Sequence, residues 1–134
     1  MPEFGHEIEI DVRFRDIDAM GHVNNAVFAT YIEQARIEYL GDVVGGDPLA
    51  VGAVLADLHI DYERPIEYGE SVVVHTRVDE LGTASIPVVH EVRAEGDRAA
   101  TAEALMVAYD SEAGESRPIP EAWREGIRAH EGWG

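Results

Sequence analysis

The sequence contains neither cysteine nor lysine, and these absences exclude several kinds of chemistry. Without cysteine the chain forms no disulfide, thiolate nucleophile or cysteine-ligated metal site, and without lysine it forms no Schiff base. It also lacks a basic and apolar N-terminal leader, and no apolar run approaches the roughly 20 residues that a membrane helix requires. We therefore expect a cytoplasmic protein with no membrane anchor.

The ten basic residues are all arginines, and 27 acidic residues outnumber them to give a formal net charge of -17. Such a surface repels the phosphates that dominate nucleic-acid affinity, so we expect no nucleic-acid partner. The composition is typical either of a saline cytoplasm, where salt screens repulsion between carboxylates, or of GC-rich codon usage, and both explanations stay open. A length of 134 residues fits one domain spanning residues 1–134.

Apolar and charged residues alternate from Glu7 to Phe14, which is the pattern of a half-buried strand. A polar loop follows, over residues 15 to 23. Asn24 and Asn25 then offer side chains that can cap the start of a helix. The loop is therefore expected to lead directly into a helix.

From Ala26 to about Leu40 the apolar residues recur three or four apart, which predicts a long helix. Charged residues are few on this segment, so we expect most of its circumference to pack against other parts of the protein. Glycines and a proline are expected to end the helix and form the next loop: Gly41, Gly45, Gly46 and Pro48.

Residues 53 to 110 read as four successive strands, which are separated by turns centred on Gly69, Gly82 and Gly96. A short C-terminal helix is expected at about residues 120–130. One strand, a long helix and then four strands predict an α+β protein in which one helix packs on one antiparallel, five-stranded sheet.

Three segments carry a resemblance to a known family. They read Phe14-Arg-Asp-Ile-Asp-Ala-Met-Gly-His-Val-Asn-Asn25, Tyr31-Ile-Glu-Gln-Ala-Arg36 and Tyr62-Glu-Arg-Pro-Ile-Glu-Tyr-Gly-Glu70. They resemble the hotdog-fold thioesterase superfamily, in particular the 4-hydroxybenzoyl-CoA thioesterase-like and YbgC-like acyl-CoA thioesterases. Gly82, Ser85 and Tyr109 also fall at familiar places, so the resemblance covers nearly the whole chain.

The resemblance implies a hotdog fold, in which the antiparallel sheet wraps around one long central helix. It also implies a homodimer, or a dimer of dimers, with active sites formed between subunits. The implied activity is hydrolysis of an acyl-CoA to a free acid and coenzyme A, with coenzyme A as part of the substrate and no separate cofactor. In that family an acid at the second aspartate of the D-x-D segment carries out the chemistry, and this position is Asp18 here.

Thioester hydrolysis requires an activated water or an attacking group, and then stabilisation of an oxyanion. Cysteine is absent, as is the Gly-x-Ser-x-Gly segment of a nucleophile elbow, so a loop carboxylate is the leading candidate. Asp18 acts either as a general base towards water or as a nucleophile that forms an anhydride, and the sequence leaves both routes open. Glu33 is the backup carboxylate, although its spacing from Arg36 also fits an ion pair.

Backbone amides at the start of the long helix are suited to the oxyanion, and Asn24, Asn25 and Ala26 lie there. Asn25 falls where some relatives have a catalytic histidine or tyrosine, which implies an amide that orients water or contacts the acyl group. Gly52 resembles a glycine whose amide contacts the thioester carbonyl in the benzoyl-CoA enzymes. The residues expected to line the acyl pocket are aromatic: Phe28, Tyr31 and Tyr62.

Asp16 and His22 are interpreted as residues that shape the loop, because a loop aspartate is usually a turn residue and a single loop histidine usually donates a structural hydrogen bond. The histidines do not have metal-ligand spacing, so no metal is expected. Arginines are the only fixed cations for the phosphates of coenzyme A. The candidates are Arg64, Arg93 and Arg117, although solvated surface charge is the simpler interpretation of each.

Two other classes of function stay open. One is a different hotdog enzyme, either a thioesterase acting on acyl carrier protein or an enoyl-thioester hydratase, whose Asp/His pairing is not evident in the sequence. The other is a non-catalytic acyl-CoA-binding module that passes a signal to an attached domain. The sequence contains no helix-turn-helix segment, which argues against a self-contained regulator.

Overall fold

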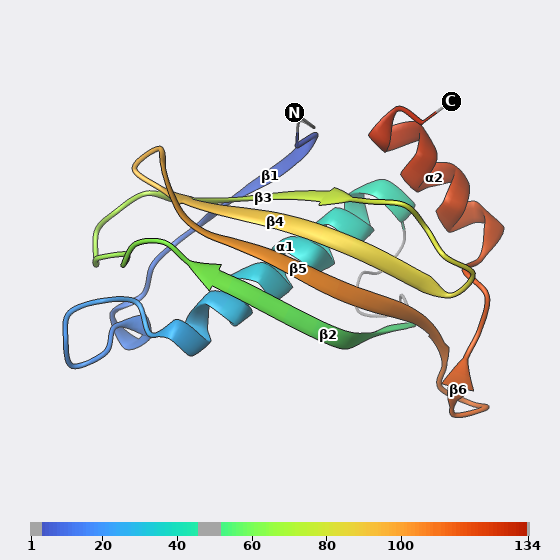
Figure 1. Ribbon diagram of the computed structural model, residues 1–134, viewed down its shortest axis with the longest axis horizontal. Coiled ribbons are helices and arrows are strands. Elements are labelled where there is room, and N and C mark those ends of the chain that lie inside the picture. Colours follow the sequence, from blue (N-terminus) through green and yellow to red (C-terminus); the bar gives the residue numbers. More distant parts are fainter. Residues whose placement is uncertain (1–3, 46–51, 134) are drawn as a thin grey trace.

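A computed structural model of the chain describes residues 4–45 and 52–133 (Figure 1). Gly46 and Pro48, which were expected in the loop after the long helix, lie outside the described residues. The elements follow the chain in this order: β1 (His6–Ile10), a 3-10 helix (Phe14–Asp16), α1 (Asn25–Val44), β2 (Ala53–Tyr62), β3 (Val72–Val78), β4 (Ser85–Ala94), β5 (Asp97–Asp110), β6 (Glu115–Ser116) and α2 (Glu121–Glu131).

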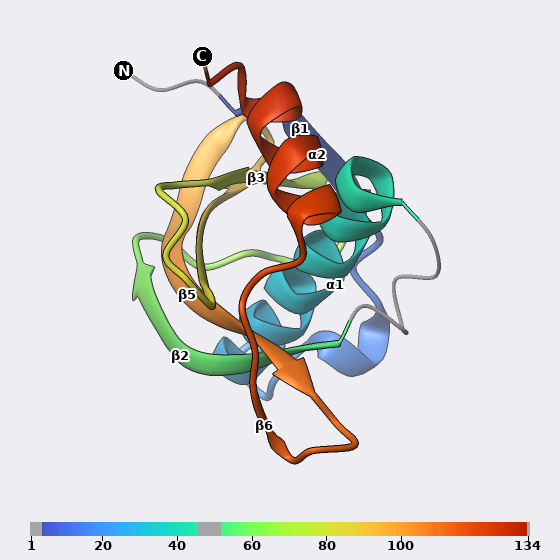
Figure 2. The ribbon, with the colours of Figure 1, turned by 90° about the vertical axis from the view of Figure 1, so that its right-hand side faces the viewer.

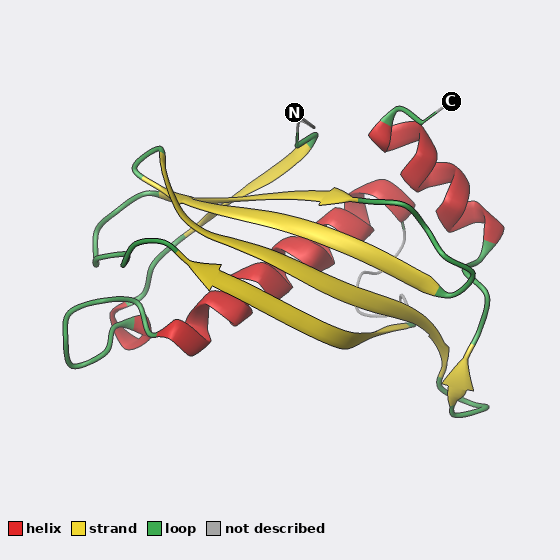
Figure 3. Cartoon of the chain, in the orientation of Figure 1, coloured by secondary structure: helices red, strands yellow, loops and turns green. Residues whose placement is uncertain are grey.

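The strands form one antiparallel sheet with the order β1-β3-β4-β5-β2, and the two-residue β6 pairs with β5 (Figure 3). The strands β2 and β3 follow each other in sequence but do not pair. The connection between them crosses the sheet, so β1 and β2 become its two long edges.

The long helix α1 lies against one face of the sheet, which curls around it when the molecule is viewed end on (Figure 2). The side chains of β3 alternate strictly between buried and half-buried, as expected for a strand with one face on the core. This arrangement is the hotdog fold that the family resemblance implied.

Two apolar clusters make up the core between α1 and the sheet. Between them lies a polar pair, in which Thr76 Oγ1 on β3 is 3.0 Å from His90 Nδ1 on β4. Both residues are fully buried, and the nearby Arg36 of α1 is only 4% exposed. Arg36 makes no ion pair with Glu33 or any other carboxylate in the described residues, so the expected Glu33–Arg36 pair is not formed in this chain.

The first strand is shorter than predicted. It was expected to run from Glu7 to Phe14, but it ends at Ile10, so the prediction is wrong for residues 11 to 14. Ile10 pairs with Val72, the first residue of β3, so the chain beyond it has no strand to pair with. It turns instead into the 3-10 helix, where Phe14 is 79% exposed.

The long helix also ends later than predicted, since Gly41 lies inside α1 and the helix continues to Val44. A helical glycine costs about 1 kcal/mol relative to alanine. Val43 and Val44 pack against the second apolar cluster, and this packing outweighs the local preference. The helix ends at Gly45, whose φ of 86° is readily adopted by glycine.

The turn between β4 and β5 is a two-residue hairpin, at the place where the sequence indicated a glycine turn. Glu95 and Gly96 both have positive φ angles, 51° and 82°, as the type I′ turn of a twisted hairpin requires. The C-terminal helix α2 packs beside the end of α1 and buries Ile127. None of the helices described is both long enough and apolar enough to span a bilayer.

Candidate active site

The loop between the 3-10 helix and α1 is closed by its own backbone. The Asp18 N–H donates to the His22 carbonyl at 2.7 Å, and the Gly21 N–H donates to the Asp18 carbonyl at 3.0 Å. The buried Val23 donates its N–H to the Ile66 carbonyl at 2.7 Å, which ties the loop to the segment after β2. The position of Asp18 is therefore defined both locally and from across the fold.

The two carboxylate oxygens of Asp18 differ in their hydrogen bonds. Oδ1 accepts the backbone N–H groups of Met20 at 2.8 Å and His22 at 3.3 Å. No hydrogen bond to Oδ2 is found within residues 4–45 and 52–133. One oxygen thus orients the side chain, and the other is available for chemistry.

Asp18 lines a cavity of about 410 Å³, a size suited to a small-molecule ligand. The cavity lies where the Asp18 loop, the start of α1 and the end of β2 meet. Its lining residues are Asp18, His22, Val23, Asn25, Phe28, Tyr62, Glu63, Arg64 and Pro65. The fold thus brings together four of the residues predicted for the site: Asp18, Asn25, Phe28 and Tyr62.

The start of α1 presents one backbone amide to this region. Asn24 caps the helix, because its Oδ1 accepts the Ala26 N–H at 2.9 Å and its carbonyl accepts the Val27 N–H at 2.8 Å. The amides of Ala26 and Val27 are therefore occupied. The Asn25 N–H has no hydrogen-bond partner among the residues described, so it is the one best suited to an oxyanion.

Tyr62 and Phe28 form the aromatic wall of the cavity. Their ring centroids are 5.1 Å apart and the rings are nearly perpendicular. The Tyr62 hydroxyl donates to the Asn25 carbonyl at 2.7 Å, which links the end of β2 to the start of α1. Burial raises the pKa of Tyr62 above its ordinary value, which favours the protonated hydroxyl that donates this hydrogen bond.

Tyr31, the third aromatic residue predicted for the acyl pocket, does not line this cavity. It is buried in the core, and its hydroxyl donates to Asp16 Oδ2 at 2.7 Å. Burial first, and then the hydrogen bond and charge of Asp16, raise the pKa of Tyr31. Asp16 also accepts the Arg13 N–H at 2.9 Å, which fits the loop-shaping part expected of it.

Two other predicted residues do not reach the cavity within one chain. Gly52 precedes β2, whereas Tyr62 ends it, and ten residues of strand separate them by about 30 Å. Glu33 is exposed on α1, eight residues and about 12 Å of helix beyond Asn25. A contribution from either residue to this cavity would require a second chain or another binding position.

The three arginines considered for coenzyme A have partners within the chain. Arg64 lines the cavity, but its guanidinium bonds both Glu70 oxygens, at 3.2 and 2.9 Å, and the Ala94 carbonyl at 2.6 Å. The hydrogen bond between them raises the pKa of Arg64 and lowers that of Glu70. Of the other two arginines, Arg93 forms an ion pair with Glu91, and the Arg117 guanidinium stacks on the Trp123 ring.

The sequence singled out neither Glu63 nor Pro65, yet both line the cavity. The only signal for them was their place in the segment from Tyr62 to Glu70. His22 was expected to shape the loop, and its backbone does so through Asp18 and Glu67. Its side chain also lines the cavity. No group of three or more His, Asp or Glu side chains suited to a metal ion occurs in residues 4–45 and 52–133.

The chain is similar to known proteins along nearly its whole length. The model of a family described as "Thioesterase-like superfamily" matches residues 12–127. A thioesterase from Thermus thermophilus, whose structure was solved in complex with coenzyme A and Zn, is 43% identical with a TM-score of 0.92, and the match covers 100% of this chain and 99% of that one.

Two curated proteins are also similar. The putative acyl-CoA thioesterase YneP of Bacillus subtilis (strain 168) is 28% identical over 109 residues, which are 78% of this chain and 79% of YneP. The chloroplastic acyl-acyl carrier protein thioesterase ATL3 of Arabidopsis thaliana is 36% identical over 94 residues. That match includes 67% of this chain but only 49% of ATL3, so the chain spans about half the length of this plant relative.

Proposed function

Because this chain belongs to the thioesterase-like superfamily, we propose that it hydrolyses the thioester of an acyl-CoA to a free acid and coenzyme A, with Asp18 as general base or nucleophile. A fold hosts many functions, so the proposal is argued from the site. The observation that carries it is the cavity in which the Asp18 carboxylate, the start of α1 and the Phe28/Tyr62 wall meet.

The route through a general base assigns each group one task. With the thioester carbonyl oxygen near the Asn25 N–H, Asp18 Oδ2 takes a proton from water as the water oxygen bonds to the carbonyl carbon. The helix start stabilises the oxyanion of the tetrahedral intermediate. When the carbon–sulfur bond breaks, the leaving thiolate receives the proton from Asp18, and the free acid remains.

The route through a nucleophile uses the same atoms in two stages. Asp18 Oδ2 bonds to the carbonyl carbon, the thiolate leaves and takes a proton from solvent, and an anhydride forms. Water then hydrolyses the anhydride and restores the carboxylate. In both routes Oδ1 keeps its backbone hydrogen bonds, so the side chain does not need to reorient between steps.

The β2 edge supports the further proposal that the active unit is a homodimer. A long edge strand exposes unpaired backbone groups that readily pair with another strand. On β2 the apolar Val54 and Leu55 are 42% and 44% exposed. If the β2 strands of two chains paired antiparallel, Gly52 of each would lie near the Tyr62 end of the other, where the Asp18 cavity is.

The dimer is tested by light scattering on wild type and Leu55→Asp. We expect the variant to become monomeric and to lose activity, because a charge on the paired edge opposes association. Tyr68→Asp, which places the same charge on an exposed aromatic residue outside β2, should stay dimeric. A monomeric wild type that is fully active would overturn the proposed pairing.

Release of free thiol from a panel of acyl-CoAs tests the activity, with wild type, Asp18→Asn and the exposed control Asp11→Asn. We expect hydrolysis by wild type and the control, and a decrease of at least about a hundredfold in Asp18→Asn at an unchanged melting temperature. Full activity of Asp18→Asn would show that the Asp18 carboxylate is neither the general base nor the nucleophile. Tight acyl-CoA binding without any hydrolysis would instead favour a non-catalytic binding module.

The similarity to ATL3 favours acyl carrier protein thioesters as a second candidate substrate class. Its test compares kcat/KM for the same acyl group on coenzyme A and on acyl carrier protein. The proposal predicts a higher kcat/KM for the coenzyme A thioester. A clearly higher kcat/KM for the carrier-protein thioester would make acyl carrier protein the substrate class instead.

A further inference from the structure

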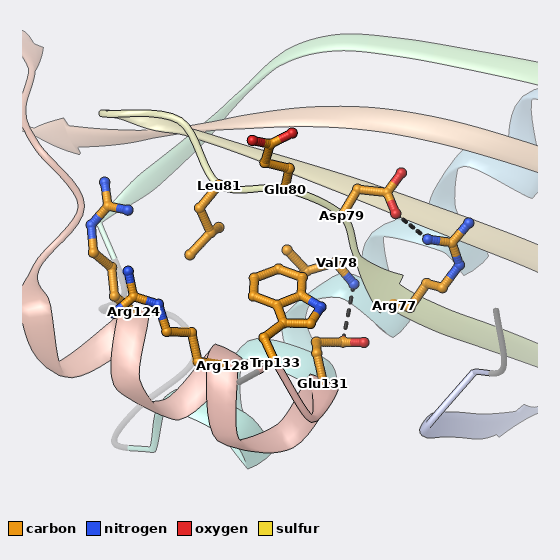
Figure 4. A pocket seen from close by; sticks show the side chains of 9 residues that line it. All are labelled: Arg77, Val78, Asp79, Glu80, Leu81, Arg124, Arg128, Glu131 and Trp133. Carbon is orange, nitrogen blue, oxygen red and sulfur yellow. Dashed lines mark hydrogen bonds and ion pairs between the residues drawn. The ribbon is translucent and has the colours of Figure 1, made fainter.

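A second cavity lies between the end of β3 and α2, at the opposite end of the sheet from the Asp18 loop (Figures 1 and 4). Its volume is about 550 Å³, which is within the range of small-molecule sites. The lining residues come from the β3 end, the loop after it, α2 and the turn after α2: Arg77, Val78, Asp79, Glu80, Leu81, Arg124, Arg128, Glu131 and Trp133. The hydrolytic mechanism uses none of them.

The α2 side of this cavity carries two guanidinium groups. Arg124 and Arg128 are four residues apart on α2, where two like charges disfavour the helix. Arg124 uses Nη2 to donate to the carbonyls of Gly82 and Thr83, at 2.6 and 3.0 Å. Among the carboxylates in the part of the chain that the structure describes, the nearest to Arg128 is that of Glu121, at 3.9 Å. Both groups therefore keep N–H donors for another acceptor.

Most of the acidic residues in the lining are already engaged. Asp79 pairs with Arg77, and Glu131 accepts the Tyr39 hydroxyl and the Val78 N–H. In Figure 4, Glu80 lies beyond Leu81 from the two α2 arginines. The lining as a whole has three basic and three acidic residues, but on α2 the two arginines outnumber Glu131, so that side of the cavity carries a net positive charge in a chain whose formal net charge is -17.

An aromatic surface adjoins the arginines because of how α2 ends. Gly132 has a left-handed φ of 74°, and the Gly132 and Trp133 N–H groups both donate to the Arg128 carbonyl. This turn folds the chain back, so that the Trp133 indole lies between Leu81 and Glu131 in the cavity (Figure 4). The residue is 37% exposed, which leaves indole surface for a flat ring to stack on.

We propose that this cavity is a second binding site, separate from the Asp18 cavity, for a phosphate ester whose sugar also carries an aromatic base, as in a purine nucleotide. Guanidinium groups bind phosphate through paired N–H donors, and Arg124 and Arg128 supply them. The ring stacks on Trp133 beside Leu81. The ligand is either a free nucleotide or the nucleotide end of coenzyme A.

Calorimetric titration of the full chain with adenosine diphosphate tests the site. Arg128→Gln and Trp133→Ala should each raise the Kd at least tenfold, because one removes a phosphate donor and the other the stacking surface. Arg98→Gln, which alters another half-exposed arginine far from the cavity, should leave it unchanged. Adenosine and benzoate, which lack the phosphate, should bind at least tenfold more weakly than the diphosphate.

Asp18→Asn separates this site from the proposed hydrolysis and should bind the diphosphate with the wild-type Kd. If coenzyme A competes with adenosine diphosphate, its nucleotide end is a ligand of the site. If coenzyme A does not compete, the ligand is a free nucleotide. The proposal is overturned if millimolar diphosphate does not bind, if Arg128→Gln binds it as tightly as wild type, or if Asp18→Asn abolishes binding.

Discussion

His90 should make the stability of this protein depend on pH between about 6.5 and 3. Its imidazole is fully buried on β4 beside Thr76. Burial, and after it the positive charge of Arg36, lower the pKa of His90 from 6.5 to about 3. Because the charged form of a buried imidazole is disfavoured, the folded protein takes up this proton far less readily than the unfolded chain.

The sign and size of the effect follow from proton linkage. Above pH 6.5 neither state binds the proton, so the free energy of unfolding is unaffected. Below it the unfolded chain binds the proton and the folded protein does not, so stability falls as the pH falls towards 3, by up to about 1.4 kcal/mol per pH unit. Between pH 7 and pH 5 the loss from His90 amounts to about 2 kcal/mol.

Urea unfolding at pH 7 and pH 5, at one protein concentration, measures this loss. The matched variant is Thr76→Val/His90→Leu, which removes both partners of the Thr76–His90 hydrogen bond together, so that neither is left without the other. The wild-type free energy of unfolding should fall by about 2 kcal/mol more than that of the variant. Arg36→Met should lie between them, since it removes the charge that helps to lower the pKa of His90. Equal losses in wild type and the double variant would refute the reasoning.

Three further predictions concern positions near the site and between the helices. Tyr31→Phe should lower the free energy of unfolding by about 1 kcal/mol, because Asp16 Oδ2 loses its hydroxyl partner in a half-buried position. Asp18→Ala should be less stable than Asp18→Asn by about 1 kcal/mol at equally low activity, since only asparagine keeps an oxygen for the loop amides. Gly126→Ala should cost about 1 to 3 kcal/mol, because its Cβ would lie 2.6 Å from the Val43 carbonyl oxygen.

Thermal unfolding and thiol release at saturating acyl-CoA check these values. Glu125→Ala, which changes an exposed neighbour on the same helix, serves as the control for Gly126→Ala and should unfold at the wild-type temperature. A wild-type melting temperature for Gly126→Ala would contradict the close approach of α1 and α2. If Asp18→Ala and Asp18→Asn unfolded alike, the Oδ1 hydrogen bonds would contribute nothing to the loop.

Local patterns along the sequence were sufficient to predict most elements of the fold. Alternation in the strands, helical spacing after Asn25 and the glycine turns each act over a few residues, and the structure has elements in all these places. The resemblance over the segment from Phe14 to Asn25 selected Asp18, and the structure places this residue in a cavity with Asn25. Its part in the reaction stays a prediction.

Only the tertiary structure decided which of these residues meet. The chain crosses the sheet after β2, so β2 pairs with β5 and places Tyr62 beside Phe28, 34 residues earlier in the sequence. Packing of Val43 and Val44 carried α1 past Gly41. The Asn24 side chain accepts the Ala26 N–H, so the Asn25 N–H is the one without a hydrogen-bond partner among the described residues. Such outcomes depend on contacts between distant segments and on competition for each hydrogen-bonding group, and neither has a signature in the local order of residues.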